Sequence, residues 1–497
     1  MQQLSGQDAM FLHAEIDGLP QHIGGVSIYD QSTVSGGKVR FKEILAMLES
    51  RLHLSPIFRR KLSFVPYNLG RPYWVEDPDF DLEYHVRHIA LPKPGDWRQL
   101  CILAARIHSQ PLRRDKPMWE MYIIEGLDNV EGYPPGCFGL LLKVHHCAMD
   151  GATGAQFMNI VHDLTPEVAD VGTPPPWLVE RPSKGRMLRQ AYKDIWLKPG
   201  QTINMLKQAG PAFMRIRQGK KEERFHSLDD KQSTRFQGKI SRHRVVGARK
   251  FDFETVREIK NAHPGATIND AMLTVVAGGM RKYLDAKGEL PEQTLVTGCP
   301  IDVRSPEERA AGGNMVGFMN VGLRTDIADP LERLAAVHKE SQSAKAYAEA
   351  LGPRFMVDVT DVMPGNVLSL ALRTAAATGL TEASVTQNTI VTNVPGAPFQ
   401  LYMCGAALVD SLSLGPLLPN TGLFHIVYSS VQNKAGSITL SFTACRDMMP
   451  DPGFYTTCMQ ESFDELRAAT LKPAKKKAKV TKRAKVKKKT VRKKASR

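Results

Sequence analysis

The stretch that decides how this chain is interpreted is His145-His146-Cys147-Ala148-Met149-Asp150-Gly151, which ends a short apolar run. The run covers residues 137–146 and lies between Pro134-Pro135-Gly136 and the Asp150-Gly151 pair. A short apolar run bounded by turn residues predicts a buried β-strand. Side chains alternate between the two faces of a strand, so the imidazoles of His145 and His146 are expected to point in opposite directions. At most one of them can therefore serve a given pocket.

Histidine suits proton transfer near neutral pH because its ordinary pKa is roughly 6.5. An imidazole at the end of a buried strand, followed by a polar turn, is a candidate general base. Asp150 is then a candidate orienting partner or a member of a structural ion pair. The alternative is that the two histidines serve packing and the surface. No metal site is expected, because the pattern lacks the i, i+4 histidine pair of zinc hydrolases and no other His or Cys cluster has ligand spacing.

Length and composition describe a globular protein with more than one core. A chain of 497 residues exceeds one ordinary core, so two domains are expected, and 42% hydrophobic with 24% charged residues is typical of a soluble protein. The 7 cysteines are scattered, without a C-x-x-C pair, which indicates free thiols in a reducing compartment. Cys147 lies inside the motif, and a thiol nucleophile there is the less favoured alternative to a histidine base.

The N-terminal residues do not predict a signal peptide, because Asp8, Glu15 and Asp17 interrupt any apolar run. No apolar stretch approaches the roughly 18–20 residues of a spanning helix. We therefore expect a cytoplasmic protein that associates peripherally with the inner membrane or with lipid inclusions.

The net charge of +15 belongs to one segment. Residues 472–497 hold 15 Lys or Arg and no acid; without these 15, the 66 basic residues of the chain fall to 51, against 51 acidic ones. This tail is too poor in apolar residues to fold alone and is expected to be disordered. Contact with an anionic membrane or lipid-body surface is the favoured role. An inert tail is the alternative, and nucleic-acid binding is not favoured because aromatic side chains for base stacking are missing.

The rest of the chain alternates strands and helices on both sides of a linker. Prolines at 174–176 and 182 begin the linker, and two basic helical stretches follow within residues 185–217. We expect the first stretch to pack on the body through Met187, Leu188 and Ala191, the alternative being an interfacial membrane helix. The expected strands are 22–29, 121–125, 294–299, 316–323, 389–393 and 437–444, and the expected helices are 41–52, 97–108, 154–164, 253–262 and 271–284.

Several segments in order resemble the bacterial wax ester synthase/acyl-CoA:diacylglycerol acyltransferase family. His145-His146 with Asp150-Gly151 is similar to the HHxxxDG signature of the CoA-dependent acyltransferase superfamily, which peptide-synthetase condensation domains share. Residues 111–120 resemble the PLxxxxPLWE segment of the narrower family, with Met118 in place of the usual Leu. The remaining matches are residues 4–8 with Phe11, 74–81, 85–88, 269–277, 313–314 and 392–396.

The resemblance implies a mixed α/β fold of two chloramphenicol-acetyltransferase-like lobes, with the active site in a channel between them. The expected division is an N-terminal lobe at 1–170, a linker at 171–240, a C-terminal lobe at 241–470 and the tail at 471–497. The implied activity moves a fatty acyl group from acyl-CoA to diacylglycerol or a long-chain alcohol, forming triacylglycerol or wax ester. Acyl-CoA is then a substrate, and no cofactor is expected.

The resemblance also implies roles for single residues. His146, the second histidine of the motif, is the general base and acts on the alcohol without a covalent acyl-enzyme, with His145 in support. Asp150 is structural, with Arg304 as its candidate partner, and Gly151 allows the turn.

Two pairs outside the motif are further candidates. Asn269 and Asp270 are expected to support the fold, with Asp270 as a helix cap and Asn269 in the turn before it. Thr392 and Asn393 end a strand and are candidates for an oxyanion donor or for lining the channel.

Two other functions compete with this interpretation. A condensation-type enzyme would use carrier-bound acyl groups, but we expect no attached carrier or adenylation module, since none is recognised in these 497 residues. A basic coat protein of lipid bodies or nucleic acid would depend on the tail alone. The DFGWG segment of plant-type relatives does not occur in the sequence.

Overall fold

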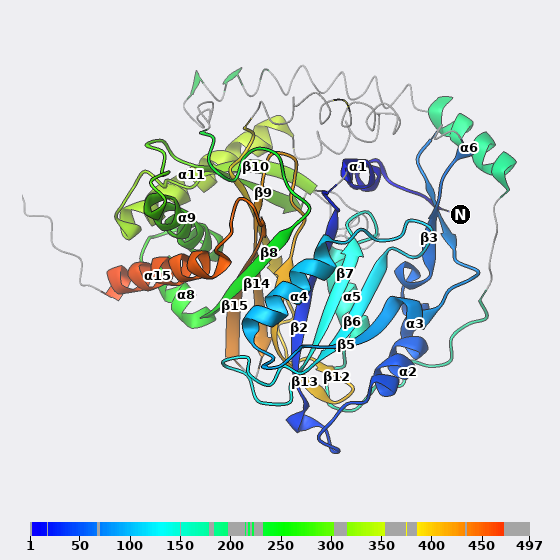
Figure 1. Ribbon diagram of the computed structural model, residues 1–497. Coiled ribbons are helices and arrows are strands. Elements are labelled where there is room, and N and C mark those ends of the chain that lie inside the picture. Colours follow the sequence, from blue (N-terminus) through cyan, green and yellow to red (C-terminus); the bar gives the residue numbers. More distant parts are fainter. Residues whose placement is uncertain are drawn as a thin grey trace, which may run out of the picture.

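The computed structural model describes residues 2–16, 18–66, 70–149, 151–177, 183–196, 232–302, 316–352, 385–432 and 435–471, with a few isolated positions between them. Two mixed six-stranded sheets form the centres of two lobes, which lie side by side in Figure 1. The mixed α/β architecture expected from the sequence is confirmed.

The first sheet combines strands from both halves of the sequence. β2 pairs antiparallel with β7, and the first residue of β2 lies opposite the last residue of β7, so His22 and His145 are neighbours. In spatial order the strands are β12 (Tyr402–Met403), β13 (Ala406–Leu414), β2 (His22–Asp30), β7 (Phe138–His145), β6 (Trp119–Glu125) and β5 (Val86–Ala90).

The second sheet has helices on its outer face, as Figure 1 shows. Its strands in spatial order are β10 (Val316–Gly322), β9 (Val296–Asp302), β11 (Thr389–Pro395), β14 (Leu423–Gln432), β15 (Ala435–Cys445) and β8 (Arg244–Asp252). The covering helices are α8 (Phe253–Asn261), α9 (Ile268–Ala286), α11 (Pro330–Leu351) and α15 (Pro452–Leu471).

The chain leaves the second sheet after β11, forms β12 and β13 in the first sheet, and then returns to form β14 and β15. The C-terminal lobe expected at 241–470 is therefore not confined to the second sheet, because residues 402–414 complete the first one. This exchange joins the lobes covalently and by hydrogen bonds. Thr439 of β15, for example, donates to the Asp410 carboxylate of β13 over 3.2 Å.

The helix at residues 97–109 begins where local side chains satisfy its backbone. Asp96 caps α4 (Trp97–Ser109) and forms a capping box with Gln99, and its apolar stripe includes Leu100, Ala104 and Ile107. This stripe packs in a core between the first sheet and β8, so α4 helps to hold the lobes together. The other helices of this lobe are α1 (Gly6–Ala14), α2 (Phe41–Arg51), α3 (Leu82–His85) and α5 (Gly151–Val161).

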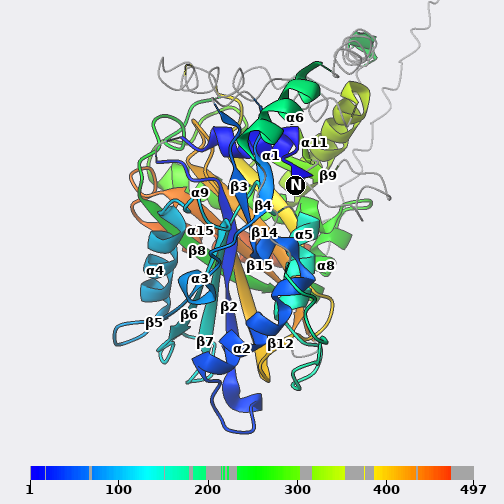
Figure 2. The same cartoon turned by 90° about the vertical axis from the view of Figure 1, so that its right-hand side faces the viewer.

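The described linker helix is α6 (Lys184–Trp196), and it packs on the body as expected. Met187 and Ala191 are buried against Val65 and Tyr73, the latter on β4 (Tyr73–Glu76). That strand belongs to a small sheet with β1 (Gln2–Gln3) and β3 (Arg60–Ser63). Figures 1 and 2 place α1 and α6 at the same end of the molecule. In the part of the chain that the structure describes, no helix combines the length and the apolar character needed to cross a membrane.

Candidate active site

The motif begins at the last residue of β7. His145 closes the strand, and His146 already lies in the turn that follows. The expected strand is confirmed for 138–145 but not for His146. The His146 amide still makes the last bond of the β2–β7 ladder, to the Gln21 carbonyl over 2.8 Å, but the chain then turns, since the Ala148 amide donates to the His145 carbonyl over 2.9 Å. The alternation of side chains between the two faces of a strand therefore applies to His145 but not to His146.

The His146 ring is held by a residue from the N-terminal helix. It stacks on the Phe11 ring of α1 with 3.8 Å between centroids and 4° between planes. The residue is half-buried, so the imidazole is fixed in plane without being sealed from the surface. A general base needs this kind of placement, because proton transfer depends on a defined distance and direction to the reacting group.

His145 is buried and serves a different purpose. Its Nε2 lies 3.0 Å from Glu15 Oε2, and the exposed fractions of the two side chains are 0% and 9%. Its Nδ1 accepts the Cys147 amide hydrogen over 3.1 Å. Arg114 also donates to Glu15 Oε2, over 3.1 Å. The two imidazoles of the motif thus have different neighbours, and both of them contact α1 or its last turn.

Charges around Glu15 keep its carboxylate ionised. Burial by itself would raise the pKa of Glu15, but the hydrogen bond from His145 and the charge of Arg114 hold it below the ordinary value. Burial lowers the pKa of His22 well below its usual value and lowers the pKa of His108 to about 4. These two neighbouring histidines remain neutral at physiological pH, and each is bonded to backbone groups.

Cys147 does not have the surroundings of a nucleophile. Its side chain is buried with Phe11, Met118 and Leu112 in an apolar cluster. Burial raises the pKa of its thiol well above the ordinary value. A thiolate is the nucleophilic form of cysteine, so this environment favours the histidine mechanism over an acyl-cysteine.

The motif turn is connected to the other lobe through Gln21. The Gln21 side-chain amide donates to the Leu19 carbonyl over 3.2 Å and to the Leu417 carbonyl, in the segment after β13, over 3.3 Å. Leu19 and Leu417 pack with Ile390 of β11 in one apolar cluster. The end of β7 and the strand that carries Thr392 therefore meet at the junction of the lobes.

The structure places Thr392 and Asn393 on opposite faces of β11. Thr392 shares its face with Ile390 and Val394, which belong to the junction cluster. Asn393 shares its face with Val391, which belongs to the core of the second lobe. One channel between the lobes cannot be lined by both side chains, and Thr392 is the one on the side of the junction.

Asn269 and Asp270 lie in the first turn of α9, which begins at Ile268. The N-cap is Thr267, so the expected position of Asp270 as the cap, with Asn269 in a preceding turn, is corrected. Asp270 instead completes a capping box and accepts a hydrogen bond from His338 Nδ1 over 2.9 Å. The helix starts earlier than expected because the Thr267 side chain accepts the Asp270 amide hydrogen.

Three other predicted positions are only partly placed. Gly151 is the first residue of α5, three positions before the expected helix start. Asp150 and Arg304 lie outside the described residues, and so does the ion pair expected between them.

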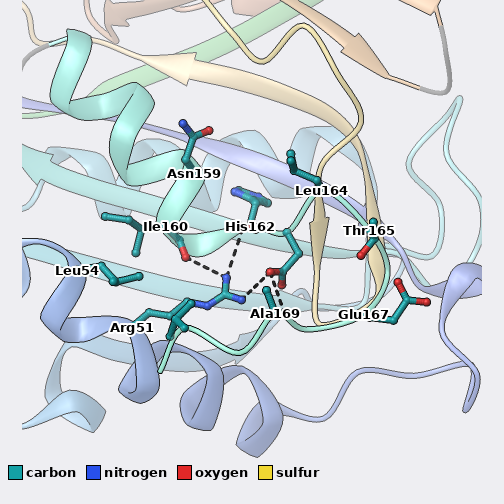
Figure 3. A pocket seen from close by; sticks show the side chains of 11 residues that line it. Arg51, Leu54, Asn159, Ile160, His162, Leu164, Thr165, Glu167 and Ala169 are labelled. Carbon is teal, nitrogen blue, oxygen red and sulfur yellow. Dashed lines mark hydrogen bonds and ion pairs between the residues drawn. The ribbon is translucent and has the colours of Figure 1, made fainter. Parts of the chain in front are cut away.

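A cavity of about 330 Å³ lies at the other end of α5. Arg51, Leu54, His162 and Leu164 line it, as Figure 3 shows, and Asp163 is a further lining residue. The 11 residues of α5 separate this cavity from the motif by roughly 16 Å at 1.5 Å per residue. It is therefore a feature of the first lobe that is separate from the motif turn.

Glu15 and Arg114 were not predicted as site residues. In the sequence Glu15 is notable only as an acid that interrupts an apolar run, and it lies 130 residues before His145. Phe11 belongs to a segment that resembles the family, but the resemblance assigned it no role. A sequence signal for these contacts is limited to the position of Phe11 and Glu15 four residues apart, on one helical face.

Comparisons with known proteins show the family of this chain. The model of the wax ester synthase/diacylglycerol acyltransferase catalytic domain matches residues 4–272, and the model of the WS/DGAT C-terminal domain matches residues 312–467. A Mycobacterium tuberculosis protein named as a diacylglycerol O-acyltransferase is 31% identical over 477 residues, covering 94% of this chain and 90% of its own. A second one is 32% identical over 415 residues, covering 81% of this chain and 84% of its own.

Solved structures show the same fold. The wax ester synthase/diacylglycerol acyltransferase of Marinobacter aquaeolei VT8 superposes with a TM-score of 0.66 at 24% identity, covering 95% of this chain and 100% of that one. The first condensation domain of the calcium-dependent antibiotic synthetase gives 0.56 at 14% identity, covering 95% and 96%. The two-lobed fold is thus confirmed, and the chain belongs to the wax ester synthase/diacylglycerol acyltransferase family.

Proposed function

We propose that this chain transfers a fatty acyl group from acyl-CoA to the hydroxyl of diacylglycerol or a long-chain alcohol, with His146 as the general base. The activity follows from family membership over nearly the whole chain. The role of His146 rests on one observation, the half-buried imidazole held against Phe11 at the end of β7. The products are triacylglycerol and wax ester.

The reaction needs little beyond a positioned base and a polarised carbonyl. His146 takes the proton of the acceptor hydroxyl as its oxygen attacks the thioester carbonyl. The tetrahedral oxyanion then collapses, the C–S bond breaks, and the thiolate of CoA receives the proton from the imidazolium. Thr392 is our candidate for a hydrogen-bond donor to the oxyanion, because it lies on the junction side of β11.

Transfer from a carrier-bound acyl group is the alternative. The observation that favours it is the fold shared with condensation domains, at 12–15% identity in the structures compared. One such structure, the starter condensation domain of rhizomide synthetase, is a complex with C8-CoA. A fold of this kind can thus accommodate a free acyl-CoA, which is the donor we propose for this chain.

The test is a product assay with purified protein, one acyl-CoA, and competing diacylglycerol and hexadecanol. His146→Ala should lower the rate about 10²–10⁴-fold, the usual contribution of a general base, with an unchanged melting temperature. His88→Ala is the matched control, because it removes an imidazole from the edge strand β5. A His146→Ala rate within a few-fold of the parent would exclude this residue as the base, and product from acyl-carrier alone would favour the alternative.

We also propose that the basic tail brings the enzyme to its apolar substrates. Residues 472–497 hold 15 Lys or Arg and no acid, and each basic residue near an anionic bilayer contributes on the order of 1 kcal/mol. Attraction of this size falls as salt is added. It supports peripheral contact with an anionic membrane or lipid-body surface, where diacylglycerol and long-chain alcohols reside.

A further inference from the structure

The last turn of α1 contacts the catalytic motif at two points. Phe11 stacks on His146, and Glu15, the C-cap residue of α1, binds the Nε2 side of His145. The two contacts are four residues apart in the sequence, which is one helical turn. One short element thus contacts the base and also the residue before it.

The hydrogen bonds of His145 determine which of its nitrogens carries the proton. A backbone N–H can only donate, and the Cys147 amide lies 3.1 Å from Nδ1. Nδ1 must therefore present its lone pair, and the ring proton lies on Nε2. That proton is donated to Glu15 Oε2 over 3.0 Å. Glu15 is the acceptor that makes this tautomer of a buried imidazole favourable.

The tautomer of His145 matters because the motif turn depends on it. The Cys147 amide donates to Nδ1 of the His145 ring, and the Ala148 amide donates to the His145 carbonyl over 2.9 Å. His146 lies between His145 and Cys147, so its backbone direction follows from this local network. If Nδ1 were protonated, its N–H would face the Cys147 N–H. Two donors cannot form a hydrogen bond, so the turn would lose the bond between Cys147 and the His145 ring.

The surroundings keep Glu15 in the form that this arrangement requires. Arg114 donates to the same Oε2 atom over 3.1 Å, and the Glu15 side chain is 9% exposed. The pKa of Glu15 lies below its ordinary value, although burial alone would raise it. The carboxylate is thus an ionised acceptor that two donors hold in place.

We propose that Glu15 is a positioning residue for acyl transfer, which acts through the tautomer of His145 on the turn that presents His146. The inference rests on the proposed role of His146 as the base. It assigns Glu15 no contact with substrate and no proton transfer. Its effect belongs to kcat, because a displaced base slows the chemical step and leaves the binding of acyl-CoA unaltered.

The test compares Glu15→Gln with Glu15→Leu, two side chains of similar size. Glutamine retains an oxygen that accepts the His145 Nε2 proton, whereas leucine has no acceptor. We expect Glu15→Gln to keep kcat within about threefold of the parent and Glu15→Leu to lose roughly 10- to 100-fold, the scale of a misplaced catalytic group. The KM for acyl-CoA should change by no more than about twofold in both.

A second readout follows the tautomer directly. In protein labelled with [15N]histidine, the ring nitrogen shifts of His145, assigned with His145→Asn, should show a proton on Nε2 in the parent and in Glu15→Gln. Glu15→Leu should lose this pattern. A parent protein with the proton on Nδ1 would overturn the proposal.

Three further outcomes would also overturn it. These are equal kcat values for the two Glu15 variants, a change confined to KM, and a Glu15→Leu protein that melts below the assay temperature together with Glu15→Ala. The last result would make Glu15 a folding residue. His146→Ala in the same preparation separates the hypotheses: if it is inactive and Glu15→Leu is fully active, the positioning role alone is wrong. An active His146→Ala would contradict the proposed base.

Discussion

Arg51 and Asp163 form a buried ion pair, and their contributions to the free energy of unfolding should be strongly coupled. Arg51 ends α2 and Asp163 follows α5, and their charged atoms are 2.6 Å apart with 2% and 7% of the side chains exposed. Arg51 also donates to the carbonyls of Ile160 and His162, over 3.0 and 3.4 Å. One guanidinium thus satisfies two carbonyls at the C-terminal end of α5. Figure 3 shows these contacts.

The expected cost of breaking the pair follows from what each variant leaves buried. In Arg51→Met, Asp163 keeps the hydrogen bond from the Ala169 amide, which is 3.2 Å long. It loses Arg51, the one cation with which it forms an ion pair among the described residues. An uncompensated buried charge costs about 3–5 kcal/mol of the free energy of unfolding. Unfolding entropy is about 2.1 cal/mol/K per residue, so a cooperative transition of this 497-residue chain would lose roughly 3–5 °C in Tm. Arg51→Met/Asp163→Leu should recover most of this loss, since apolar replacement of both partners is often close to neutral.

Denaturant unfolding of the parent, both single variants and the double variant gives the coupling energy directly. Acyl transfer by the folded single variants should stay within a few-fold of the parent, because the pair lies at the end of α5 remote from His146. A loss below about 1 kcal/mol in Arg51→Met, or single-variant losses that simply add in the double variant, would show that the two side chains are not energetically coupled.

Three other predictions concern the mechanism, the tail and the second lobe. Cys147→Ala should keep acyl transfer, and initial rates should give intersecting double-reciprocal lines; parallel lines with an acylated Cys147 would contradict direct attack. Deleting residues 472–497 should weaken binding to phosphatidylglycerol vesicles at low salt and leave turnover on detergent-dispersed substrate unchanged, and equal vesicle binding would exclude the tether. The folded-state pKa of Asp270 is held below its usual value, although burial opposes this, by hydrogen bonds that include those from His338 and Thr267. Its stabilising effect should therefore be complete above the unfolded pKa near ~3.9 and be lost as the pH falls through the lower folded value, so Asp270→Asn should be less stable than the parent at pH 7 and show a smaller loss in acid.

Elements that depend on neighbouring residues can be predicted from the sequence alone. The strand at β7 and the helix α4 follow from apolar periodicity bounded by turn residues and by the Asp96 cap, all within a few positions of each other. The ordered motifs also determined the family, and through it His146 as the candidate base. These signals are local or are carried by short motifs, so one sequence is enough to detect them.

The contacts between distant segments, in contrast, become visible only in the folded chain. Residues 402–414 complete the first sheet, Thr392 faces the junction while Asn393 does not, and Glu15 binds an imidazole 130 residues away. β7 also ends at His145 because the Ala148 amide turns back to the His145 carbonyl, and the last ladder bond joins the His146 amide to the Gln21 carbonyl, a partner that no periodicity in residues 137–146 reveals. Strand order and side-chain pairing are set by the free energy of packing between segments far apart in the chain, whereas hydrophobic period and capping report only the preferences of each segment alone.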